Sequence, residues 1–180
     1  MFPSWLKSMA DVAFKPLHIA VLTVSDTRTD DTDKSGGVLA ERIQAAGHVL
    51  HDKRICRDDI YALRALVSGW IADVAPAVVI TTGGTGLTGR DVTPQALSVL
   101  FDRQIDGFGE MFRWLSYADI GTSTLQSRAL AGVANGTFIF CLPGSSGAVA
   151  DAWDRLIAAQ LDARTRPCNL VELLPRLTER

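Results

Sequence analysis

Thr81-Thr82-Gly83-Gly84-Thr85-Gly86-Leu87-Thr88-Gly89-Arg90-Asp91-Val92-Thr93-Pro94 is the stretch that says most about the fold of this protein. It leaves the apolar run 77–82, which predicts a buried β-strand. It then enters a segment in which Thr93 can cap a helix and Pro94 can occupy the first turn. The glycines in between allow a tight turn with converging N–H groups. The stretch therefore predicts a strand, an anion-binding loop and a helix.

The residues before this stretch show the same alternation of strand and helix. The apolar run 17–24 has no helical stripe, as in a strand buried on both faces, and 48–55 is a second strand-like segment. Between them we expect a helix with Ser35 as its N-cap, and 58–74 has apolar residues at helical spacing. This order predicts a right-handed parallel sheet with helices on its faces. Ligand sites are expected at the carboxyl ends of its strands.

The residues after the stretch complete the predicted sheet. An amphipathic helix is expected over 108–117, and Asn135-Gly136 between the apolar runs 129–133 and 137–142 predicts a tight hairpin. The loop 143–147 precedes a last helix. We therefore expect an α/β fold of three layers, α-β-α, with a mostly parallel sheet and a β-hairpin.

Composition excludes several classes of protein. A chain of 180 residues with 47% hydrophobic content favours one domain, and a net charge of -2 gives no broad basic surface for nucleic acid or anionic lipid. The start of the chain is interrupted by charges, so neither a signal peptide nor a membrane span is expected. Cys56, Cys141 and Cys168 are too widely spaced for a disulfide framework or a structural zinc site, which favours the cytoplasm.

The glycine loop also matches two nucleotide-binding patterns in part. Gly84 to Gly89 satisfies G-x-G-x-x-G, but the loop follows the third predicted strand and its helix begins late, at Thr93. A nicotinamide-dependent oxidoreductase therefore stays the least favoured alternative. A Walker A loop is excluded because Arg90-Asp91 stands where a lysine and a hydroxyl residue are required.

Acidic residues stand close to the predicted anion site. Asp91 lies at the exit of the loop, and a carboxylate beside an anionic ligand implies a bridging Mg²⁺. Ser25 and Asp26 follow the first strand and so belong to the rim of the predicted pocket. The alternative is that both aspartates are purely structural, with Asp91 capping the next helix and Asp58 stabilising the start of a helix. The aspartates of 29–33 lack the spacing of a calcium loop and are interpreted as a mobile, solvated loop.

Four motifs stand out along the chain: Val24-Ser25-Asp26, the segment 81–96, Gly107-Phe108-Gly109-Glu110 and Leu142-Pro143-Gly144-Ser145. Together they resemble the MoaB/MogA molybdopterin-binding family, which is related to the G domain of gephyrin. The likeness runs over residues 17–169, which we take as a molybdopterin-binding domain between an N-terminal arm, 1–16, and a C-terminal tail, 170–180. The segments 121–128 and 161–169 are similar to MoaB more than to MogA.

The resemblance implies a set of site residues. Asp91 and Asp58 match acids needed for catalysis and would also hold Mg²⁺. The residues expected to bind molybdopterin or ATP are Ser25, Asp26, Thr82, Gly83, Gly84, Thr85, Gly86, Thr93, Pro94, Glu110, Pro143, Gly144 and Ser145. One departure is Arg57, which precedes the second acid where MogA-like chains have proline.

The activity implied for this family is adenylylation of molybdopterin by Mg-ATP, as a step of molybdenum cofactor biosynthesis. A non-catalytic molybdopterin-binding protein of the same fold is the alternative. The resemblance also implies a trimer or a dimer of trimers. A homo-oligomer is further favoured by the helix 108–117, on which Trp114 and Tyr117 lie off the stripe formed by Phe108, Met111, Phe112 and Leu115.

Overall fold

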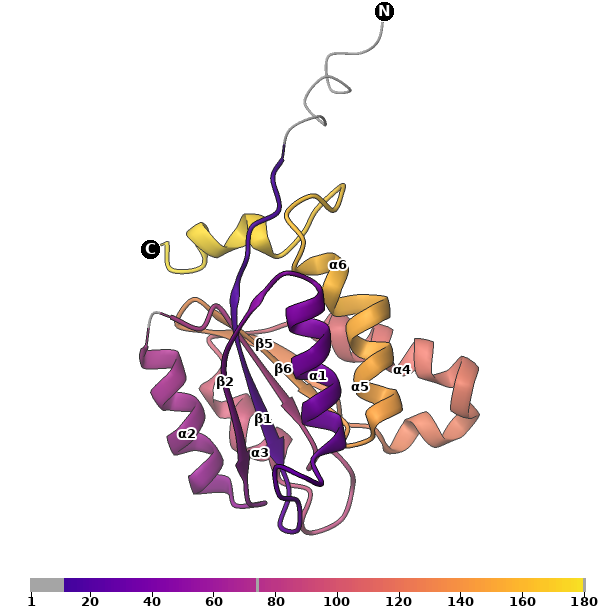
Figure 1. Cartoon of the computed structure of the whole chain (residues 1–180). Coiled ribbons are helices and arrows are strands. Elements are labelled where there is room, and N and C mark those ends of the chain that lie inside the picture. Colours follow the sequence, from indigo (N-terminus) through magenta and orange to yellow (C-terminus); the bar gives the residue numbers. More distant parts are fainter. Residues whose placement is uncertain (1–11, 74, 180) are drawn as a thin grey trace, which may run out of the picture.

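The computed structural model describes residues 12–73 and 75–179. Within them, six strands form one mixed sheet in the order β2-β1-β3-β6-β5-β4 (Figure 1). The first four of these strands are mutually parallel, and β5 and β4 run antiparallel to their neighbours. The bounds of the strands are β1 His18–Val24, β2 Val49–Cys56, β3 Val78–Thr82, β4 Arg103–Gln104, β5 Leu130–Ala134 and β6 Thr137–Leu142.

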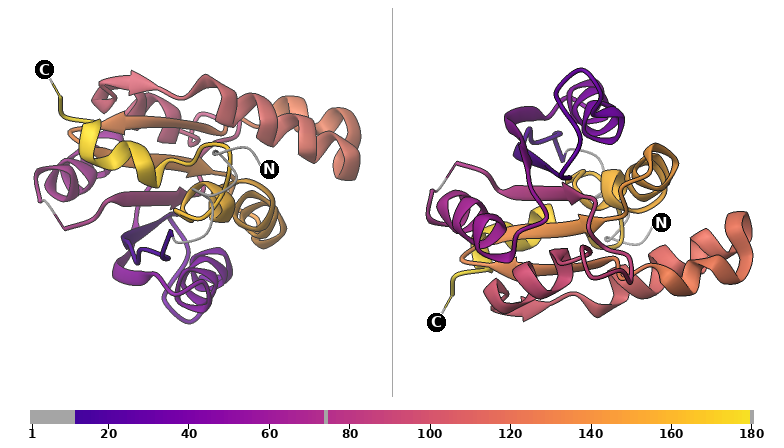
Figure 2. Two further views of the ribbon diagram at one scale, coloured as in Figure 1. Left: turned by 90° about the horizontal axis from the view of Figure 1, so that it is seen from above. Right: turned by 90° about the horizontal axis from the view of Figure 1, so that it is seen from below.

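Helices cover both faces of the sheet, so the predicted three-layer α/β fold is confirmed (Figures 1 and 2). One face carries α1 (Lys34–Ala45), α4 (Asp106–Ile120), α5 (Ser146–Ala152) and α6 (Ala158–Gln160). The other carries α2 (Ile60–Ala72) and α3 (Thr93–Leu97). Short helical turns complete the list: η2 Ser98–Leu100, η3 Gly121–Gln126, η4 Trp153–Ile157 and η5 Val171–Arg176. Among the described residues, no helix combines the length and the apolar character needed to cross a bilayer.

The central strands are apolar along their whole length because both of their faces are covered. In β1, Ile19 and Val21 pack with α1 and α5, whereas Ala20 and Leu22 pack with α2, and all four are fully buried. Every residue of β3 is buried as well. This two-sided burial explains why the strands read as continuous apolar runs rather than as alternating ones.

The predicted hairpin is confirmed at Asn135-Gly136. Both residues have positive φ, 46° and 81°, as a two-residue turn of the primed type requires, and β5 and β6 pair antiparallel around them. The hairpin continues into β4, which pairs with β5 through Arg103 and Gln104. Sequence analysis did not predict this strand, because two exposed residues carry no periodicity.

Four local predictions were wrong. Thr93 is the first residue of α3 and not its N-cap, which is Val92, because the Thr93 hydroxyl is bonded to the Gly83 carbonyl. The N-cap of α1 is Asp33 and not Ser35, since the Asp33 carboxylate accepts the Gly36 N–H at 2.9 Å while Ser35 lies inside the helix. The 29–33 loop is not wholly solvated, because Asp33 is buried. Met111 does not join the core stripe: α4 buries Phe108, Gly109 and Phe112, and about half of Met111 is exposed (51%).

The predicted N-terminal arm, 1–16, and C-terminal tail, 170–180, both contact the domain. Of the predicted arm, residues 1–11 lie outside the described residues, and Phe14 packs against His48 with ring centroids 5.0 Å apart. The predicted tail is described to Glu179 and packs on the domain, where Val171 is buried and Leu174 lies against the core. At the opposite side of the molecule, α4 and η3 extend beyond the sheet (Figure 2).

Candidate functional site

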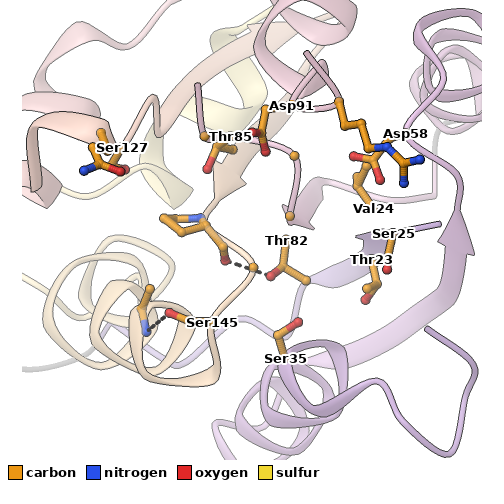
Figure 3. Close-up of a pocket in the computed structure, with 18 of the residues that line it drawn as sticks. Thr23, Val24, Ser25, Ser35, Asp58, Thr82, Thr85, Asp91, Ser127 and Ser145 are labelled. Atoms are coloured by element: carbon orange, nitrogen blue, oxygen red, sulfur yellow. Dashed lines mark hydrogen bonds between the residues drawn. The ribbon is translucent and has the colours of Figure 1, made fainter. Parts of the chain in front are cut away.

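A polar cavity of about 560 Å³ opens at the carboxyl ends of β1, β3 and β6 (Figure 3). Parallel strands bring their carboxyl ends to one edge, so loops that are far apart in sequence meet there. The cavity is lined by the residues that follow β1, the glycine loop after β3, the loop after β6, and one side of α4 and η3. Its volume is typical of small-molecule sites.

The glycine loop turns sharply as soon as β3 ends. Gly83 and Gly84 have φ of 104° and 66°, values that L side chains rarely adopt. A Cβ would collide with the Val24 carbonyl oxygen at Gly83 and with the Thr93 hydroxyl at Gly84. Thr93 holds the loop by donating its hydroxyl to the Gly83 carbonyl (2.8 Å) and its N–H to the Gly84 carbonyl (3.0 Å). Glycine is therefore required at both positions.

The amides of this loop are available to a ligand. Among the hydrogen bonds between described residues, none uses the N–H of Gly84 or Thr85. Their carbonyl groups are satisfied within the protein, by the Thr93 and Arg128 N–H groups. Buried or half-buried N–H groups need a partner, so an anionic oxygen in the cavity would complete this loop.

The loop after β6 closes against the glycine loop. The Thr82 hydroxyl donates to the Pro143 carbonyl at 2.9 Å, and a Cβ on Gly144 would lie 3.3 Å from the Gly83 Cα. Ser145 begins α5 as its N-cap, accepting the Ala148 N–H at 3.2 Å. The two loops thus form one wall of backbone amides and hydroxyl groups.

Two carboxylates with opposite pKa shifts line the cavity. Burial raises the pKa of Asp58, and the nearby charges of Asp26 and Asp91 raise it further. Burial also opposes ionisation of Asp91, but the Thr88 hydroxyl and N–H, 2.7 and 2.8 Å from Asp91 Oδ2, together with the Gly86 N–H and the charge of Arg128, outweigh it and lower the pKa of Asp91. Asp91 is therefore firmly ionised, while Asp58 would gain from a cation.

Asp26 lies behind these carboxylates rather than on the cavity wall. Its Oδ1 accepts the Asp58 N–H at 3.3 Å, and its Oδ2 pairs with Arg90 at 3.1 Å. Asp26 therefore fixes the backbone of Asp58 and keeps a guanidinium at the cavity rim. This supporting role is seen only in the tertiary structure.

The cavity offers few ligands for a preformed Mg²⁺ site. The described residues contain no group of three or more His, Cys, Asp or Glu residues close enough to hold a metal ion. Asp58 and Asp91 do share the cavity and repel each other. Mg²⁺ is usually held by one or two carboxylates together with substrate phosphates, so this pair fits a metal that arrives with a phosphorylated ligand.

Most of the residues named by sequence analysis meet in the cavity. The following line it: Ser25, Asp58, Thr82, Gly83, Gly84, Thr85, Gly86, Asp91, Pro143, Gly144 and Ser145. Asp26 and Thr93 support its walls from behind. Pro94 lies in the first turn of α3 without lining the cavity, and Glu110 lines a separate hollow of about 200 Å³ beside Arg113.

Several residues that line the cavity were not predicted from the sequence. Arg28 and Ser35 line it, and so do several residues of α4, η3 and their surroundings: Phe112, Ser116, Ile120, Ser123, Thr124, Gln126 and Ser127. The polar run 121–128 was noted only for its family likeness. Its position beside the glycine loop depends on the path of α4, which no local pattern encodes.

The loop after β1 is anchored by a buried ion pair. Asp33 accepts the Thr23 hydroxyl at 2.8 Å and the Lys53 ammonium at 2.9 Å, and its side chain is fully buried. Lys53 also lies 3.5 Å from the exposed Asp30. Thr23, which donates to Asp33, and Ser35, two residues after Asp33, both line the cavity (Figure 3).

Comparisons with known proteins agree on one group of relatives. A family model described as a probable molybdopterin binding domain matches residues 20–163. Molybdenum cofactor biosynthesis protein B of Escherichia coli (strain K12) is 56% identical over 162 residues, which cover 90% of this chain and 95% of that protein. A crystal structure of molybdenum cofactor biosynthesis protein B superposes with a TM-score of 0.81 at 44% identity, covering 83% of this chain and 94% of that one. The tungsten cofactor synthesizing protein MoaB from Pyrococcus furiosus gives 0.69 at 36% identity, with 78% and 89% covered.

Proposed function

The chain belongs to the family of probable molybdopterin-binding domains of molybdenum cofactor biosynthesis, and we propose that it binds molybdopterin in the cavity of Figure 3 and adenylylates it with Mg-ATP. The resemblance to the MoaB/MogA family is thereby confirmed. The observation that supports the proposal most directly is the meeting of unpartnered glycine-loop amides with the carboxylates of Asp58 and Asp91 in one cavity.

The cavity offers separate groups for phosphate and for polar heterocycles. Anionic oxygens are matched by the Gly84 and Thr85 amides and by Arg28 and Arg90 at the rim. A pterin presents ring nitrogens and carbonyl groups, which need hydroxyl and amide partners. The serines of η3 and the loop after β6 provide such partners on the other side of the cavity.

Adenylyl transfer would need no protein nucleophile. A terminal phosphate oxygen of molybdopterin attacks the α-phosphorus of ATP, the bond from that phosphorus to the bridging oxygen breaks, and pyrophosphate leaves. In this proposal the cavity residues bind and orient the molybdopterin phosphate and the ATP α-phosphate and limit the access of water. Asp58 and Asp91 lie beside the phosphates. Mg²⁺ bound with ATP would neutralise the phosphate charge.

Asp91→Asn tests the catalytic part of the proposal. The asparagine oxygen keeps the shape of the loop and can still accept from Thr88, but the charge that would hold Mg²⁺ is lost. Turnover should fall on the order of a hundredfold or more, as for loss of an electrostatic catalytic element. Molybdopterin affinity should be unchanged or slightly higher. The assay measures ATP-dependent formation of adenylylated molybdopterin over a Mg²⁺ titration.

Glu41→Gln is the matched control, because Glu41 is exposed on α1 and does not line the cavity. Like Asp91→Asn, it replaces one carboxylate by an amide, and it should leave turnover unchanged. Equal rates for wild type and Asp91→Asn would reduce Asp91 to a residue that shapes the loop. Binding of molybdopterin without any adenylylation by the wild type would instead establish the non-catalytic alternative.

A further inference from the structure

Arg128, which sequence analysis noted only within a family-like segment, contacts the glycine loop from outside the cavity. It lies between η3 and β5 and is only partly exposed. Its backbone N–H donates to the Thr85 carbonyl at 3.0 Å, and its Nε donates to the Gly86 carbonyl at 2.7 Å. Its Nη2 donates to the Asp91 carbonyl. One residue thus holds three carbonyl groups at both ends of the loop.

These contacts determine which way the loop amides point. In a trans peptide the C=O of one residue and the N–H of the next point in opposite directions. Because Arg128 holds the Thr85 and Gly86 carbonyls on its own side, the N–H groups of Gly86 and Leu87 are turned away from it. The Gly86 N–H lies where it lowers the pKa of the Asp91 carboxylate, so these contacts orient an amide that acts on Asp91, whereas Thr93 holds the carbonyls that precede the free amides of Gly84 and Thr85. The bond to the Asp91 carbonyl fixes the other end of the loop and with it the backbone that carries the Asp91 carboxylate.

We propose that Arg128 is a positioning residue that clamps the loop from Thr85 to Asp91 in its ligand-binding shape. The effect of Arg128 on turnover rests on the proposed function, whereas its effect on the structure of the loop does not. It also links the two walls of the cavity, because Ser127, next to Arg128, lines the cavity on the η3 side.

Arginine is suited to this task because its planar guanidinium presents several donors in a fixed fork. The fork reaches two carbonyls that lie five residues apart in sequence. A lysine carries its donors on one nitrogen and cannot hold both carbonyls in the same way. Arg128→Lys therefore keeps the charge and removes the two-carbonyl fork, whereas Arg128→Met removes both; the backbone bond to the Thr85 carbonyl stays in each variant.

The test compares Arg128→Lys and Arg128→Met with the control Arg176→Met, whose side chain is exposed (70%) and pairs with Glu179. The first readout is amide hydrogen exchange in the full chain without ligand. The N–H groups of Asp91 and Thr93 donate to carbonyls of the loop, those of Thr88 and Gly84. In both Arg128 variants these amides should exchange at least about tenfold faster, with strand amides unchanged. The control should show no change.

The second readout is molybdopterin affinity and turnover with Mg-ATP. A displaced loop should weaken molybdopterin binding about tenfold and lower kcat on the order of a hundredfold, and Arg128→Lys should not restore kcat. Normal exchange at Asp91 and Thr93 in a folded variant would overturn the clamp. Full recovery of kcat by lysine would also overturn it, since charge alone would then suffice. If the wild type makes no adenylylated product, the proposed function fails, and the exchange and affinity measurements still decide the role of Arg128.

Discussion

Lys53→Met should destabilise the protein more than Asp33→Asn, although both remove one partner of the same ion pair. The Asp33 carboxylate is fully buried, and without Lys53 its donors among the described residues are the Thr23 hydroxyl and the Gly36 N–H. Breaking a buried pair so that a charge stays behind costs about 3 to 5 kcal/mol. Because the Lys53 side chain is 21% exposed, we expect the lower end, about 3 kcal/mol.

Asp33→Asn should cost less for two reasons. The asparagine oxygen can still accept the Gly36 N–H and cap α1, since asparagine is as good an N-cap as aspartate. The remaining charge is Lys53, which reaches solvent and lies near Asp30. A loss of about 1.5 to 2 kcal/mol is expected, the lower end of the range for one hydrogen bond to a charged group.

The pH dependence of unfolding provides an independent test of whether the Lys53→Met variant is destabilised by the charge left on Asp33. Burial opposes ionisation of Asp33, but the hydrogen bonds from Lys53, Gly36 and Thr23 outweigh it and lower the pKa of Asp33. Its contribution to stability is therefore present above the unfolded pKa of about 3.9 and is lost as the pH falls through the lower folded pKa. In Lys53→Met the unpaired carboxylate is relieved by protonation, so the deficit should shrink as the pH falls from 7 toward 4.

The assay is urea unfolding of wild type, both single variants and the double variant at one protein concentration, at pH 7 and at pH 4.5. Fixed concentration matters because an oligomer gains stability by mass action. The reasoning is refuted if Asp33→Asn is the more damaging change, or if the Lys53→Met deficit is the same at both pH values.

Three further predictions concern the cavity and the assembly. Gly84→Val places a branched side chain at a positive φ and into a threonine hydroxyl, so calorimetry should show molybdopterin affinity lost, whereas Gly89→Ala, where a Cβ meets nothing within 4 Å, should bind normally. Asp26→Asn removes a like charge that raises the pKa of Asp58, so the acid limb of kcat/KM should move to lower pH; an unmoved limb would mean that Asp58 does not control it. Trp114 on α4 is 73% exposed, and light scattering should show a homotrimer or hexamer that Trp114→Arg dissociates, a result that a monomeric wild type would contradict.

Much of the fold, and one wall of the cavity, could be predicted from short stretches of sequence. Strands buried on both faces produce apolar runs, and the hairpin at Asn135-Gly136 needs two positive φ values that few residue pairs adopt. The glycine loop follows the same rule, because Gly83 and Gly84 take φ values that a side chain would oppose. The parallel order of the strands then assigns the ligand to their carboxyl ends. Each of these inferences depends on properties of a few adjacent residues, so the sequence by itself determined them.

Only the tertiary structure decided how distant residues complete the site. Arg128 reaches the glycine loop, Ser123 and Ser127 line the cavity beside it because of the course of α4, and Asp26 supports Asp58 from 32 residues away. Helical periodicity showed that α4 has an apolar stripe, but whether Met111 is covered depends on the neighbouring elements. Burial of Asp33 likewise depends on Lys53, from the next strand. Contacts of this kind are made by packing between elements, and no repeat or turn signal within either segment records them.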